Sequence, residues 1–154
     1  MKIELISIGS ELVCGQVRDS NAPLIASKLT ELGFNVVNHT ISGDNSEELK
    51  FSLQAASERA DLIIITGGLG PTNDDITRKT VADFCNVALV KDEESVNHIE
   101  GLIGNIHSQK YVNCLKQAKI PEGSVAIHNA TGTAQGFLVN FSQTNIICLP
   151  GVWP

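Results

Sequence analysis

The sequence predicts an α/β fold, a three-layer α/β/α sandwich with a mostly parallel sheet and one antiparallel strand. Strand-like segments alternate with helical patterns up to residue 85, which is typical of successive βαβ units. The run DLIIIT at 61–66 is apolar without alternation, as expected for a strand covered on both faces. Near the carboxyl terminus, the short connection SQTN between two strand-like segments predicts a hairpin and hence the antiparallel strand.

The first half of the chain predicts two strand–helix pairs. Ser20 or Asn21 is expected to cap the first helix, and Gly33 is expected to end it. Asn45 is the expected cap of the second helix. The predicted elements are a strand at 2–9, a loop at 10–19, a helix at 20–33, a strand at 34–43 and a helix at 44–60.

The second half is less regular. A helix at 74–85 is expected after a glycine-rich hinge, and a second helical pattern lies at 93–108, weakened by Gly101 and Gly104. Short strands are predicted at 124–128, 136–141 and 145–151. At 154 residues, without a linker or repeat, the chain is expected to form a single domain over 1–154.

Composition excludes several classes of function. The net charge of −6, with scattered Lys and Arg, argues against nucleic-acid binding. No apolar run approaches the roughly 20 residues that span a bilayer, and no signal peptide is evident, so we expect no membrane contact and a cytoplasmic protein. The four cysteines form no C-x-x-C pair, which argues against a zinc site or a disulfide framework.

Acidic side chains follow all three of the early predicted strands. Glu11, Asp44 and the pair Asp74–Asp75 each stand in a loop that leaves the carboxyl end of a strand. Ligands of open α/β sheets bind beyond these ends. We therefore expect the acidic loops to surround one ligand site.

Two glycine-rich loops could hold a phosphate. Gly67, Gly68 and Gly70 allow backbone N–H groups to converge on an anion at a helix start. The loop is neither a Walker motif nor G-x-G-x-x-G, and on its own it could equally be a sharp turn whose aspartates favour the helix dipole. The second loop, NATGTAQGF with Gly132 and Thr133, could be an ordinary wide turn or hold the far end of an extended ligand.

A set of segments resembles one known family. TGGLGPTNDDIT, GSELVCGQV, GDN, NATGTAQGF and LPGV resemble, as a set, the N-terminal domain of the competence/damage-inducible CinA family. That domain belongs to a molybdopterin-binding superfamily with MogA- and MoaB-like members. The family usually has G-T-A-P-G-F, where this sequence has Gln135 in place of proline.

The resemblance implies an enzyme whose small-molecule ligand contains pyrophosphate, a nucleotide or a pterin. CinA-type domains suggest a pyrophosphohydrolase of ADP-ribose-like nucleotides that depends on Mg²⁺ or Mn²⁺, and the pterin branch suggests binding or adenylylation of molybdopterin. Asp44 and Asp75 are the implied catalytic residues. The implied metal ligands are Glu11, Asp44, Asp74 and Asp75, and the implied ligand-binding residues are Gly67, Gly68, Gly70, Thr72, Lys116, Gly132 and Thr133.

The resemblance also bears on assembly and on domains. Relatives form dimers or trimers, so a homo-oligomer is expected. The family continues past this point into further portions, in some members an amidohydrolase domain for nicotinamide mononucleotide. Because the sequence ends at LPGVWP, we expect that second activity to be absent. A third alternative is a ligand-binding module without catalytic activity.

Overall fold

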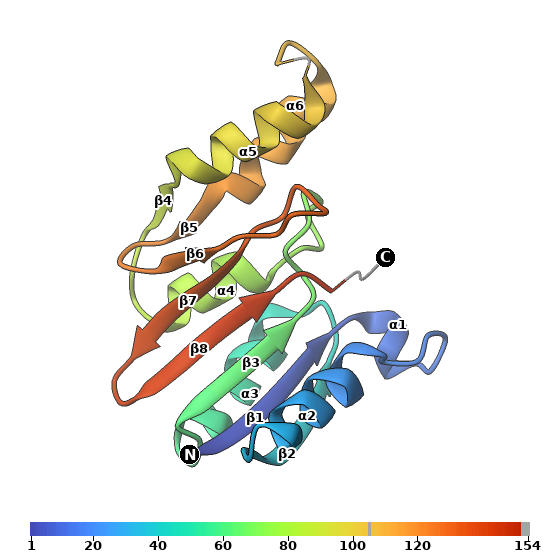
Figure 1. Ribbon diagram of the computed structural model, residues 1–154, viewed down its shortest axis with the longest axis vertical. Helices are drawn as coiled ribbons and strands as arrows, with labels where there is room; N and C mark the ends of the chain where they lie inside the picture. Colours follow the sequence, from blue (N-terminus) through green and yellow to red (C-terminus); the bar gives the residue numbers. More distant parts are fainter. Residues whose placement is uncertain (105, 152–154) are drawn as a thin grey trace.

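The computed structural model describes residues 1–104 and 106–151, and its centre is a six-stranded sheet in the order β2-β1-β3-β8-β7-β6 (Figure 1). The strands are β1 (Lys2–Ile8), β2 (Asn35–Ser42), β3 (Leu62–Thr66), β6 (Val125–Ile127), β7 (Gly136–Phe141) and β8 (Thr144–Leu149). β2, β1, β3 and β8 are parallel, and β7 runs antiparallel to both β8 and β6. Since β6 therefore runs in the direction of β8, β7 is the one reversed strand of this sheet among the described residues, and the predicted sheet is confirmed.

Helices cover both faces of the sheet. One face packs against α3 (Ser46–Ser57) and α4 (Thr77–Phe84), through a core that includes Leu49, Leu53 and Val81. The other face packs against α2 (Asn21–Glu31), where Ala22 and Ile25 meet side chains of β1 and β3. This arrangement confirms the predicted three-layer sandwich, because apolar residues on both faces of the central strands require cover on both sides.

A peripheral region lies beside the sandwich, and the sequence patterns predicted only its longest helix (Figure 1). It contains β4 (Leu89–Lys91), α5 (Glu93–Ile103), α6 (Gln109–Cys114), the 3₁₀ helix η1 (Leu115–Ala118) and β5 (Lys119–Pro121). β4 and β5 form an antiparallel two-stranded sheet. Val96, Ile99, Cys114 and Ala118 form its own small core, so we name residues 86–121 the peripheral region.

The end of α5 differs from the prediction. The helical pattern was expected to continue through Ile106, but α5 ends at Ile103 because Gly104 takes φ 72°, which is incompatible with helix continuation. Ile106 is 47 % exposed. Asn105 lies outside the described residues, as does the end of the predicted LPGV segment at residue 152.

Three local expectations near the strand ends are also corrected. The predicted loop at 10–19 contains a short helix, α1 (Ser10–Val13). The N-terminus of α2 is capped by Asp19, whose Oδ1 accepts from the N–H groups of Asn21 and Ala22, and not by a side chain at 20 or 21. α4 begins at Thr77 and not at Asp74, because the residues before it form a turn that is held by the Asp75 carboxylate.

The topology gathers five loops at one edge of the sheet. β1, β2, β3, β6 and β8 all run in the same direction, so the segments that follow them leave from the same edge. None of the helices in the described ranges is long and apolar enough to cross a membrane.

Candidate functional site

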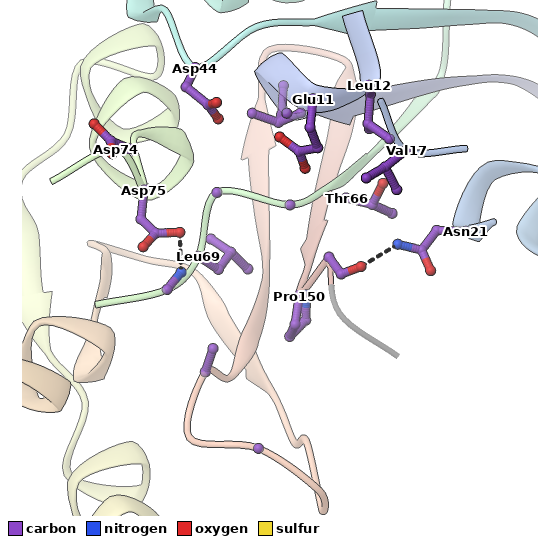
Figure 2. A pocket seen from close by; sticks show the side chains of 18 of the residues that line it. Glu11, Leu12, Val17, Asn21, Asp44, Thr66, Leu69, Asp74, Asp75 and Pro150 are labelled. Atoms are coloured by element: carbon purple, nitrogen blue, oxygen red, sulfur yellow. Dashed lines mark hydrogen bonds between the residues drawn. The ribbon is translucent and has the colours of Figure 1, made fainter. Parts of the chain in front are cut away.

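A cleft of about 750 Å³ opens at this edge of the sheet and is lined by residues of all five loops (Figure 2). Most of the predicted site residues line it: Glu11, Asp44, Gly67, Gly68, Gly70, Asp74, Asp75, Gly132 and Thr133. Thr72 and Lys116 do not. Thr72 is hydrogen-bonded to Asp75, and Lys116 Nζ makes an exposed contact of 3.5 Å with Asn73 Oδ1.

The first glycine-rich loop, residues 67–75, is held together by Asp75. Its Oδ1 accepts from the Gly70 N–H at 2.7 Å, and its Oδ2 accepts from the Thr72 N–H and hydroxyl at 2.8 and 2.7 Å. Figure 2 shows the carboxylate turned toward the loop backbone. Both oxygens are therefore engaged by the protein, and the catalytic and metal-binding roles implied for Asp75 stay predictions.

Two successive N–H groups of this loop are available to a ligand. Gly67 N–H donates to Leu149 O, and Gly70 N–H donates to Asp75. Within the described residues, the N–H groups of Gly68 and Leu69 donate to nothing. Gly67 and Gly68 take φ 99° and 65°, and a Cβ at Gly68 would lie 2.2 Å from Thr77 Oγ1, so glycine is required here. Consecutive free N–H groups in such a turn form an anion-binding concavity.

Buried polar side chains support the loop from behind. Thr77 Oγ1 donates to Gly67 O at 2.9 Å. Arg78 Nη2 and Gln117 Nε2 both donate to Leu69 O, at 2.9 and 3.3 Å. Gln117 is 2 % exposed and lines the cleft, and its Oε1 has no hydrogen-bond partner in the described part of the chain. A buried acceptor without a partner is destabilising, so Oε1 is suited to a donor that a ligand brings.

The remaining acidic side chains come from three loops. Asp44 is tied to Ser10, because Asp44 Oδ2 accepts from the Ser10 N–H at 2.9 Å and Ser10 Oγ accepts from the Asp44 N–H at 3.2 Å. Figure 2 shows the carboxylates of Glu11 and Asp44 above the glycine loop, with Asp74 turned to the side. The described residues contain no group of three or more His, Cys, Asp or Glu side chains arranged to hold a metal ion. These residues do not by themselves form a complete cation site, and the Mg²⁺ or Mn²⁺ requirement stays a prediction.

The second glycine-rich loop, residues 129–135, lines the same cleft as the first. Asn129 organises it: its Oδ1 accepts from the Thr131 N–H and its Nδ2 donates to Ala134 O, at 3.2 and 3.0 Å. Gln135 Oε1 accepts from the Asn129 N–H at 2.6 Å, so the residue that replaces the family's proline helps to close the loop. His98 on α5 bonds the Gly132 carbonyl at 2.9 Å and therefore acts as a donor through Nε2.

Asp19 is a further acidic residue of the cleft that was not among the predicted site residues. Its side chain is 9 % exposed and lies 3.3 Å from His39 Nε2. Burial raises the pKa of Asp19, but hydrogen bonds from Ser7, Ala22 and Asn21 outweigh this effect and hold the pKa below its usual value. The position of Asp19 directly before a helical pattern is a capping signal that could have identified it. Gln117 carries no comparable signal.

Comparison with known proteins agrees with this architecture. The family model described as "Probable molybdopterin binding domain" matches residues 4–153. The chain belongs to this family. A solved structure of CinA from Thermoplasma acidophilum is 32 % identical to the chain with a TM-score of 0.90, and the alignment covers 98 % of this chain and 88 % of that one. The resemblance to CinA is therefore confirmed.

Two further proteins extend the comparison. A "Putative competence-damage inducible protein" of Acetivibrio thermocellus is 42 % identical over 154 residues, and the chain spans 37 % of its length. The molybdopterin biosynthesis enzyme MoaB of Thermus thermophilus shares the fold, with a TM-score of 0.65 and 18 % identity over 98 % of this chain and 81 % of that one. The chain therefore shares the fold of MoaB at low sequence identity.

Proposed function

We propose that the cleft binds a small ligand that combines a nitrogen heterocycle with phosphate, of the molybdopterin type. The observation that carries this proposal is that one cleft is lined by Gly68 and Leu69, whose N–H groups are free in the described chain, and by the buried Gln117, whose Oε1 has no partner there. N–H groups of a glycine turn bind phosphate oxygens. An amide oxygen accepts from the ring N–H or amino groups of a heterocycle.

The size and the family support the same ligand class. At about 750 Å³ the cleft lies within the range of roughly 300–1,000 Å³ that is usual for small-molecule sites. The description of the matching family names molybdopterin, and the MoaB relative is named a molybdopterin biosynthesis enzyme. The catalytic version of this proposal is adenylylation of the bound pterin, and the simpler version is binding without turnover.

Hydrolysis of an ADP-ribose-like nucleotide is the second candidate. It is favoured by the carboxylates of Glu11 and Asp44, which lie above the glycine loop in the same cleft (Figure 2). Because only a few acidic oxygens of the described residues converge, a divalent cation here would need phosphate oxygens of the ligand as additional partners. In this proposal Asp44 is the residue best placed to affect turnover, while Asp75 maintains the loop.

Titration calorimetry separates the ligands. The 154-residue chain is titrated with molybdopterin, ADP-ribose and inorganic pyrophosphate, each with and without Mg²⁺ or Mn²⁺, and the products are identified by chromatography. Tight binding of molybdopterin supports the first proposal, formation of AMP from ADP-ribose supports the second, and binding without any product supports a non-catalytic module. Absence of binding by all three probes would contradict the proposed site.

A variant tests how the ring is recognised. Gln117→Met removes the acceptor Oε1, while Arg78 still donates to Leu69 O, so the loop keeps its support. We expect about fivefold weaker binding of molybdopterin, since one buried hydrogen bond is worth about 1 kcal/mol, and unchanged binding of pyrophosphate. Gln54→Met, on the exposed surface of α3, is the matched control. Equal losses for both probes would contradict a role of Gln117 in ring recognition.

A further inference from the structure

The walls of the cleft have the wrong charge for an anionic ligand. Five acidic side chains line it, and Arg18 is the one basic residue among the described lining residues. The acidic residues are Glu11, Asp19, Asp44, Asp74 and Asp75. Backbone N–H groups alone offset little of this negative charge. A source of positive potential close to the glycine loop would change the balance.

Arg78 places a positive charge directly behind that loop. The residue lies in the first turn of α4 and is 5 % exposed, and its Nη2 donates to Leu69 O at 2.9 Å. Its Nε–H has no hydrogen-bond partner among the residues that the structure describes. Burial lowers the pKa of Arg78 to about 10, so the guanidinium is still charged at neutral pH.

No carboxylate of the described residues neutralises this guanidinium by direct contact. Asp75 attracts it electrostatically, but both oxygens of Asp75 are bonded to the loop. A buried charge without an ion-pair partner is unfavourable for folding. The guanidinium therefore retains most of its ability to stabilise a second negative charge on the other side of the loop.

We propose that Arg78 is the counter-charge of the phosphate site: it acts through the glycine loop on an anion bound at the N–H groups of Gly68 and Leu69. The inference rests on the proposed function and names the residue that offsets the acidic cleft. Arg78 does not line the cleft, so it is a positioning residue and touches no ligand atom. Its field is weakly screened because solvent and salt are excluded from its surroundings.

The structure allows the charge of Arg78 to be removed while the glycine loop keeps its support. In Arg78→Met, Gln117 Nε2 still donates to Leu69 O, so this carbonyl keeps a partner. Because the variant removes an unpaired buried charge, we expect the ligand-free protein to remain folded, with a melting temperature close to that of the wild type. Arg78→Lys retains the charge and should recover most of the lost affinity. Lys79→Met removes one charge from the exposed face of the same helix and is the matched control.

The experiment measures dissociation constants for inorganic phosphate and pyrophosphate by calorimetry, at low salt and at high salt. We expect Arg78→Met to weaken pyrophosphate about tenfold or more and phosphate by a smaller factor, because a charge interaction scales with the charge of the ligand. The loss should persist at high salt, and Lys79→Met should change binding less than about twofold, since exposed charges are screened.

Two outcomes overturn the inference while leaving the proposed function intact. One is wild-type affinity for pyrophosphate in Arg78→Met. The other is an equal loss for phosphate and pyrophosphate that Arg78→Lys does not recover, which would indicate distortion of the loop. If the wild type binds neither pyrophosphate nor molybdopterin, the proposed function itself fails and this inference fails with it. A melting temperature of Arg78→Lys near the wild type keeps the test valid even where the methionine variant folds poorly.

Discussion

The two glycine-rich loops of the cleft are fixed in different ways. The first loop, 67–75, is held by side chains at its end and directly after it in the chain, Asp75, Thr77 and Arg78. The second loop, 129–135, is held inside by Asn129 and Gln135, and from outside by His98 of the peripheral region. The first loop is therefore closed mainly by neighbouring side chains, with Gln117 as one distant donor to Leu69 O, whereas the second loop is bonded internally and is tied to the peripheral region through His98.

This difference suggests a division of roles. A loop with most of its polar groups already bonded loses little entropy when a ligand binds, which suits a phosphate cradle. A loop held by one long-range contact can adjust to the outer part of a ligand. The following changes test the comparison, from the largest expected effect to the smallest.

Asp75→Ala should have the largest effect, because it removes three hydrogen bonds that close the first loop. We expect a loss of about 3 kcal/mol in the free energy of unfolding, at about 1 kcal/mol for each bond, and at least roughly tenfold weaker ligand binding. Urea denaturation and calorimetry measure the two quantities. Asp74→Ala, at an exposed residue, is the control and should change stability by less than about 0.5 kcal/mol. Similar effects of both variants would show that Asp75 does not fix the loop.

Gly70→Ala compared with Gly132→Ala measures how rigid the two loops are. A Cβ at Gly70 would lie 2.4 Å from Asp75 Oδ2, which is held in place, so we expect a loss of about 1–3 kcal/mol. A Cβ at Gly132 would meet Asn129 Nδ2 at 3.0 Å, and this side-chain end can move, so we expect less than about 1 kcal/mol. Thermal unfolding of both variants checks the order, and the reverse order would overturn the comparison.

His98→Leu should have a small effect on stability and a selective effect on binding. The variant leaves the Gly132 carbonyl without its donor, while Val96 and Ile99 keep α5 packed. We expect about 1 kcal/mol of destabilisation and a several-fold loss of affinity for molybdopterin, with pyrophosphate binding unchanged. His98→Gln, which keeps a donor, is the control. A loss of pyrophosphate affinity as large as the loss for molybdopterin would show that the two loops do not act separately.

Much of the fold was predictable because its elements are local. Local signals predicted three elements: the apolar run DLIIIT, the glycine at the end of α2 and the Asn45 cap. β3, α2 and α3 lie where these signals placed them. β4 and β5 were missed because each has three residues and pairs with a segment far along the chain, so neither carries a pattern of its own. The end of α5 was misplaced because the helical spacing of Ile106 was given more weight than the helix-ending signal of Gly104.

The candidate site divides in the same way. The strand ends identified Glu11, Asp44 and both glycine loops from the sequence alone, because parallel strands bring their following loops to one edge. The tertiary structure decided which groups of the described chain remain free there: Asp75 is bonded within its loop, while Gly68 N–H, Leu69 N–H and Gln117 Oε1 are unpaired at the cleft. It also placed Arg78, which in sequence resembles any surface arginine of a helix, behind the loop. Periodicity and turn residues act over a few positions and can be read from sequence, whereas burial and hydrogen-bond saturation arise from contacts between segments that only folding brings together.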